Sequence, residues 1–132
     1  MGDMERAEHE EQSATDFAAA INHATQGVKT LRRWVGDKTF EGPLGLAAHH
    51  LYLATKRIGA GAAHLGCVPR DDDTWESLND SRNVAESRVY TLSRILGAAN
   101  DVGEDWINHE KEWSDIREPM RTAEPWIFEP LT

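Results

Sequence analysis

The feature that most constrains the fold of this chain is a seven-residue repeat of apolar side chains in its first third. The repeat alternates spacings of three and four residues, through Ala7, Ala14, Ile21, Val28 and Val35 in one series and Phe17, Ala24 and Leu31 in the other. This spacing gathers apolar side chains on one face of an α-helix, whereas a strand alternates faces at every residue. We therefore predict a helix over residues 12–35, preceded by an acidic leader, residues 1–11, that frays.

A proline, a capping pattern and the spacing of apolar residues predict two further helices. Pro43 suits the first turn of a helix, because its missing N–H needs no partner there, and we predict a helix over 43–66. Asp73 followed by Glu76 resembles a capping pattern, which predicts a helix over 74–99. The expected buried stripes are Leu44, Ala48, Leu51, Thr55, Ile58, Ala62 and Leu65 in the former and Trp75, Leu78, Ala85, Val89, Leu92, Leu96 and Ala99 in the latter.

The last quarter of the chain is predicted to form a fourth helix and an extended tail. A single helix from residue 74 to 122 would be about 73 Å long, too long for one domain of this size. We therefore place a break at Gly97 to Gly103 and a helix over 101–122, with residues 123–132 extended because they contain two prolines. Since no segment alternates like a strand, the predicted fold class is all-α. We expect an antiparallel bundle of about four helices in a single domain over residues 1–132.

Charge is distributed unevenly along the chain and restricts its partners. The 132 residues carry a formal net charge of −9. Residues 1–16 carry six acids and one base, residues 71–132 carry fifteen acids and six bases, and residues 17–70 carry seven bases and two acids. A chain this acidic is repelled by long nucleic acid, so we expect a protein partner with a basic surface instead.

Cysteine content and hydropathy indicate the compartment. Cys67 is the only cysteine, so no disulfide can form within the chain. Mean hydropathy is −0.60, and no run approaches the roughly 20 apolar residues of a membrane span. The first residues also lack the basic and apolar parts of a signal peptide. We expect a cytoplasmic protein without membrane contact.

One candidate ligand site lies in the basic middle of the chain. His50, Lys56, Arg57 and Trp34 could bind an anionic small ligand such as a nucleotide. His50, Arg57 and His64 are spaced by seven and so share one stripe of their helix. Seven residues rise about 10.5 Å, which is too far for one metal ion, so the alternative is a polar edge at a helix interface.

A candidate metal site lies in the predicted fourth helix. Asp105, His109 and Glu112 follow a four-then-three spacing that projects all three from one face. Together they could bind one metal ion. The alternative is that one carboxylate hydrogen-bonds an interfacial histidine while the other stays in water.

The apolar tail is a candidate partner-binding segment. Trp126, Ile127, Phe128 and Leu131 stand between and beyond prolines, outside any helical stripe. A tail this apolar either folds back over its own bundle or docks on a partner subunit.

The sequence as a whole favours binding over catalysis. It has no phosphate-binding glycine loop and no recognisable nucleophile with a base, so we expect neither an enzyme nor a cofactor. The expected function is an acidic helical protein-binding module that blocks a basic surface of its partner, as an immunity protein, antitoxin or virus-encoded inhibitor would. The heptads and the tail favour homo-oligomers. Two alternatives are an anionic-ligand or metal-dependent bundle protein and an oligomeric structural subunit.

Overall fold

The structure is a computed structural model that describes residues 3–37, 43–70, 73–102 and 118–123. Side chains are described for residues 5–32, 44–70, 73–100 and 118–123. The elements are helices α1 (Asp3–Asp37), α2 (Pro43–Leu65) and α3 (Asp73–Val102), followed by a short helical segment at 118–123. Within these ranges there is no strand, and the helices pack against one another, which confirms the predicted all-α bundle.

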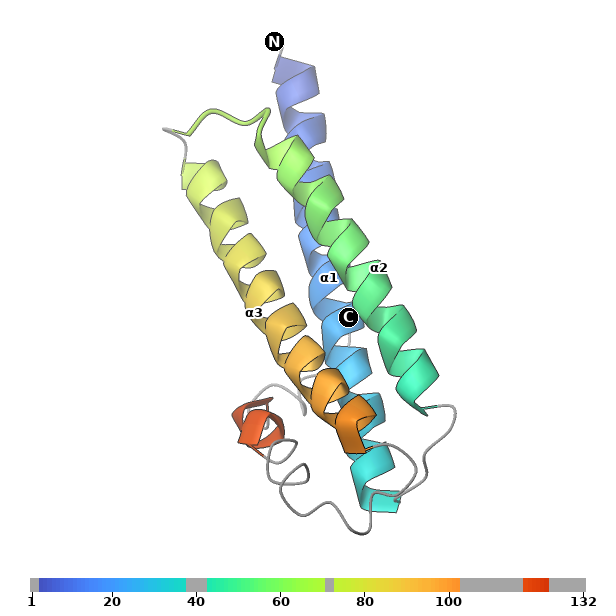
Figure 1. Cartoon of the computed structure of the whole chain (residues 1–132). Helices are drawn as coiled ribbons and strands as arrows, with labels where there is room; N and C mark the ends of the chain where they lie inside the picture. The colour runs from blue at the N-terminus through green and yellow to red at the C-terminus, as the bar shows by residue number, and fades with distance from the viewer. Residues whose placement is uncertain (1–2, 38–42, 71–72, 103–117, 124–132) are drawn as a thin grey trace.

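The three long helices lie side by side, and each contacts the other two (Figure 1). Consecutive helices run in opposite directions, so α1 and α3 both begin at the end of the bundle where α2 finishes. The turn after α2 is closed by backbone hydrogen bonds from Gly66 N to Ala62 O and from Val68 N to Leu65 O, each 3.0 Å long. The first turns of α1 project beyond this connection (Figure 1).

Helix α1 begins nine residues before the predicted start at residue 12. Its first residue is Asp3, so the predicted frayed leader is helical from residue 3 onwards. The acidic side chains that suggested fraying also stabilise a helix start, because they lie near the positive end of the helix dipole. Arg6 Nε donates to Glu10 Oε1 at 3.0 Å one turn later, which adds a favourable pair on the same face.

The other boundaries differ from prediction mainly at the end of α3. Helix α2 ends at Leu65, against a predicted 66, whereas α3 continues through the exposed Gly97 to Val102. The predicted helix over 101–122 therefore loses its first two residues to α3, and 103–117 lie outside the described residues. Ala123, assigned to the tail, is instead the buried last residue of segment 118–123.

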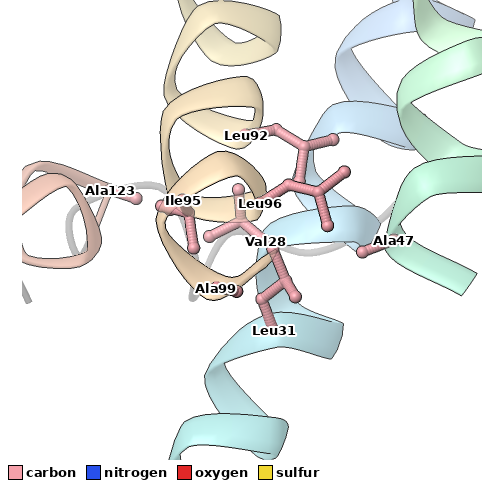
Figure 2. Close-up of a cluster of buried hydrophobic side chains, with 8 residues drawn as sticks. All are labelled: Val28, Leu31, Ala47, Leu92, Ile95, Leu96, Ala99 and Ala123. Atoms are coloured by element: carbon pink, nitrogen blue, oxygen red, sulfur yellow. The ribbon is translucent and has the colours of Figure 1, made fainter. Parts of the chain in front are cut away.

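The apolar core has two clusters. The larger joins α1, α2, α3 and segment 118–123 near the end where α1 finishes; it contains Val28, Leu31, Ala47, Leu92, Ile95, Leu96, Ala99 and Ala123 (Figure 2). The smaller lies near the α2–α3 connection and contains Phe17, Leu65, Val68 and Leu78. Each fully buried leucine or phenylalanine stabilises the fold by about 1.5–3 kcal/mol relative to exposure. Together the clusters hold the three helices at fixed spacing.

Candidate functional site

Small residues line the contact between α1 and α2. Three on α1 and three on α2 recur every seven residues and are all buried: Ser13, Ala20 and Gly27, and Ala47, Ala54 and Gly61. Ser13 Oγ donates to the backbone oxygen of Gly61 at 3.0 Å, which brings the two helices close together. A Cβ on Gly61 would stand 2.7 Å from the Phe17 ring, so only glycine fits there.

Beside these small residues runs a second row of contacts, which we term the polar seam. It consists of three cross-helix pairs: His9–His64, Asp16–Arg57 and His23–His50. Each successive pair lies seven residues further along α1 and seven residues back along α2. The repeat follows from two antiparallel helices that each return to the same face about every two turns.

The central pair joins a buried acid to a partly exposed base. The Asp16 side chain is 2% exposed, and its Oδ1 accepts hydrogen bonds from Arg57 Nη1 at 2.9 Å and Gln12 Nε2 at 3.1 Å. Its Oδ2 is also buried and has no hydrogen-bond partner among the described residues. The Arg57 side chain remains 48% exposed. Arg57 and Gln12 thus compensate the buried negative charge of Asp16.

The two outer pairs are hydrogen bonds between imidazole rings. Nδ1 of His9 lies 2.8 Å from Nδ1 of His64, and the same atoms of His23 and His50 lie 3.2 Å apart. In each bond one Nδ1 carries the proton and the other accepts it, so at least one ring must be neutral.

The pair His23–His50, which we term the lower pair, has lowered pKa values. Burial chiefly lowers the pKa of His23, and the charges of Arg57 and His49 lower it further. Burial also lowers the pKa of His50, with contributions from His23 and His49. The lowered pKa values favour the neutral form of both rings at pH 7, and the neutral form is the one that the accepting ring of the hydrogen bond must have.

The pair His9–His64, which we term the upper pair, lies in the wall of a cleft of about 450 Å³. Its lining is polar and comes mostly from α1: Glu8, His9, Glu11, Gln12, Thr15 and His64. Imidazoles and carboxylates suit a small polar or cationic ligand. Within the described parts of the chain, however, no three histidine, cysteine or acidic side chains converge closely enough to hold a metal ion.

The predicted ligand residues are divided by the structure. His50 and Arg57 lie in the polar seam, where their partners are His23 and Asp16. Lys56 is exposed. Trp34 lies in the last turns of α1, but its side chain is outside the described part of the structure. The structure therefore brings together two of the four.

The seven-residue spacing along α2 predicted the α2 half of the polar seam, but the α1 half was not predicted. His50, Arg57 and His64 stood out as a stripe, and the interface that they form with α1 is the polar edge weighed as the alternative. The signal for the missing half was present, because His9, Asp16 and His23 repeat the same spacing of seven.

The remaining predicted site residues lie outside the described residues. These are the metal candidates Asp105, His109 and Glu112 and the tail residues Trp126, Ile127, Phe128 and Leu131. Both sets stay predictions.

Charge separates along the bundle axis. Exposed acids gather where α1 and α3 begin, and we term this region the acidic end; it comprises Glu5, Glu8, Glu11, Asp73 and Glu76. The first turns of α1 carry part of it beyond the α2–α3 connection (Figure 1). Basic side chains occur towards the opposite end, on the later turns of α1 and α3: Lys29, Arg32, Arg88 and Arg94. An exposed base, Arg70 of the α2–α3 connection, also lies near the acidic end, and α2, which carries Lys56 and Arg57, runs towards that end as well.

Comparison with protein-family models, with characterised proteins and with solved structures finds no match for this chain. Among the helices described above, none combines the length and apolar character needed to cross a membrane.

Proposed function

We propose that this protein is a protein-binding module that docks its acidic end on a basic surface of a partner and blocks it, as an inhibitor or immunity-type protein does. The observation that carries the proposal is the exposure of Glu5, Glu8 and Glu11 on the first turns of α1, at the end of the bundle where α3 also begins with the exposed acids Asp73 and Glu76. A cluster of charges of one sign speeds the encounter with a partner of opposite charge and disfavours partners of like charge.

The pairing of nearby bases supports this assignment. Arg6, the basic residue among the first turns of α1, is held by Glu10 at 3.0 Å, which leaves the field of this end dominated by acids. Exposed acids in a protein–protein contact act mainly on the association rate and on its salt dependence. The proposed complex is therefore sensitive to ionic strength.

Self-association is a second part of the proposal. Four large hydrophobic side chains are exposed on α2 and α3: Leu46, Tyr52, Val84 and Tyr90. Tyrosine is enriched in protein interfaces because it combines apolar area with a hydroxyl group. We assign the protein to the cytoplasm, which suits the exposed free thiol of Cys67.

The test is affinity capture from the native host, followed by calorimetry with the purified partner. We expect a basic partner whose dissociation constant rises at least tenfold from about 50 to 300 mM salt. Glu5→Gln with Glu8→Gln should weaken binding about fivefold. The matched control, Glu86→Gln with Glu118→Gln, removes two exposed acids elsewhere and should change affinity less than about twofold. A complex indifferent to salt, or equal losses in both variants, contradicts the proposal.

A further inference from the structure

Four of the six histidines of the chain face one another in the polar seam. A first added proton can enter such a pair at the free Nε2 of the donor ring, and the Nδ1–H···Nδ1 bond survives. A second proton must occupy the accepting Nδ1. That step abolishes the hydrogen bond and leaves two cations at the distances observed here, 2.8 Å and 3.2 Å between the nitrogens. The contact between α1 and α2 thus depends on the protonation of these rings.

The charged groups around a histidine pair affect the free energy of adding a proton to its rings. Around His23 and His50, α2 supplies the cation Arg57 and the exposed His49, while Arg88 of α3 donates to Thr25 Oγ1 two residues from His23. These neighbours oppose an added positive charge. The buried carboxylate of Asp16, one heptad away on α1, is already engaged by Arg57 at 2.9 Å.

Around the upper pair the surroundings have the opposite sign. Glu8 and Glu11 of α1 line the same cleft as His9 and His64, and Arg6 is paired with Glu10. The second proton meets the same obstacle as in the lower pair, because the accepting nitrogen is still lost. Both pairs therefore lose their hydrogen bond when the accepting nitrogen is protonated.

We infer that the polar seam makes the contact between α1 and α2 a pH-sensitive latch, closed at neutral pH and loosened by acidification through the range in which histidine titrates. The device does not depend on the function proposed above. Because both outer pairs join the same two helices, their protonation acts on one contact. The two core clusters, the larger of which is shown in Figure 2, contain no histidine among their members.

The sign follows from proton linkage. His23 and His50 have lower pKa values in the folded protein than in the unfolded chain, where the ordinary value is about 6.5. Above that value both states are neutral and the contribution to stability is complete. As the pH falls below it the unfolded chain binds protons first, so the free energy of unfolding decreases until the folded pKa is passed.

The general charge of the molecule predicts the opposite trend. At pH 7 the formal net charge is −9, and the isoelectric point is about 5.0. Acidification from pH 7.5 to 5.5 therefore reduces the repulsion among like charges and by itself stabilises a compact state. A loss of stability over this interval consequently identifies specific groups that resist protonation.

The first measurement is the thermal unfolding midpoint of the full chain, followed by circular dichroism between pH 7.5 and 5.5. We expect the midpoint to fall by about 5 °C over this interval. His23→Gln with His50→Gln keeps hydrogen-bonding groups in place but removes their titration, and should abolish at least half of that fall. The control His49→Gln removes an exposed histidine from the same turn, whose charge is the smallest of the causes that lower the two pKa values, and should retain most of the fall.

The second measurement uses the unaltered protein and so does not depend on a variant that folds. Nitrogen-15 spectra of labelled histidine distinguish rings protonated on Nδ1 from rings protonated on Nε2. At pH 7.5 we expect two histidines in the Nδ1-protonated neutral form, one from each pair. The inference is overturned if every histidine shows the Nε2–H form and titrates near 6.5, or if the double variant folds and keeps the full pH dependence.

Discussion

Asp16 and Arg57 meet at the centre of the interface between α1 and α2, with Arg57 Nη1 2.9 Å from Asp16 Oδ1. The acid is buried and the base is half exposed, so the two partners are not equivalent. Loss of Arg57 leaves the carboxylate of Asp16 buried without its cation, whereas loss of Asp16 leaves a guanidinium group that is still in contact with water. This asymmetry makes the pair suitable for a double-mutant test.

Arg57→Met keeps the apolar stem of the side chain and removes its charge. We expect it to lower the free energy of unfolding by about 2 kcal/mol, because Gln12 alone then compensates the buried carboxylate. In the background of Asp16→Asn the same substitution should cost less than about 0.5 kcal/mol. Urea denaturation of the four proteins at pH 7 checks the cycle. Equal costs of Arg57→Met in both backgrounds would show that the pair contributes nothing.

Gly61→Ala should destabilise the protein although alanine is the better helix former. Its Cβ would lie 2.7 Å from the ring of the fully buried Phe17 and 3.1 Å from Cβ of Asp16. We expect a net loss of about 1–2 kcal/mol in unfolding free energy. The control is Gly59→Ala in the same helix, where nothing lies within 4 Å of the added carbon, and which should gain about 0.5–1 kcal/mol. Both variants gaining stability would contradict the close contact.

Ser13→Ala isolates the hydrogen bond that crosses from α1 to the backbone of α2. The hydroxyl group is buried and donates to Gly61 O at 3.0 Å, so its removal should cost about 1 kcal/mol. Thr55→Val is the comparison, because the Thr55 hydroxyl group donates within its own helix to Leu51 O and is exposed. Its loss should cost about 0.5 kcal/mol or less. Chemical denaturation at pH 7 distinguishes the two costs, and a Ser13→Ala protein as stable as the parent would remove this contact from the interface.

Leu92→Ala tests the larger core cluster. Leu92 of α3 is fully buried (Figure 2), and its Cδ atoms are the first that a Cβ added to Gly27 of α1 would meet. The cavity left behind should cost about 3–4 kcal/mol. Leu46→Ala removes the same atoms from a side chain that is 48% exposed, and should cost less than about 1 kcal/mol. A small effect of Leu92→Ala in thermal and urea unfolding would contradict the packing described.

The sequence was a good guide to α3 and a poorer one to the interface between α1 and α2. In α3, large apolar residues such as Leu78, Leu92 and Leu96 mark the buried face, and all three are buried. Burial of big side chains is what a hydrophobic pattern reports. The class of fold was predictable for the same reason.

At the interface between α1 and α2 the predicted stripe is confirmed only in part. Phe17, Ala24 and Leu31 are buried as expected, whereas other positions are displaced by one residue. Ala14 and Thr55 were expected inside but are exposed, while their neighbours Ser13 and Ala54 are buried. Closely packed helices bury whatever is small, including serine and glycine, and a pattern that scores apolar size does not register this. Asp16 was overlooked because a charged residue is buried only when a partner reaches it from elsewhere in the chain.

The polar seam also decides which of several alignments the first two helices adopt. A slide of one heptad would still set small residues of α1 against small residues of α2, Ser13 against Ala54 and Ala20 against Ala47. Such a slide in one direction would set His9 against Arg57 and Asp16 against His50. It would thereby place a guanidinium beside an imidazole and deprive the buried carboxylate of its permanent cation. Small residues thus permit close approach, and the sequence of charges along the seam selects a single alignment, as isolated polar positions do in coiled coils.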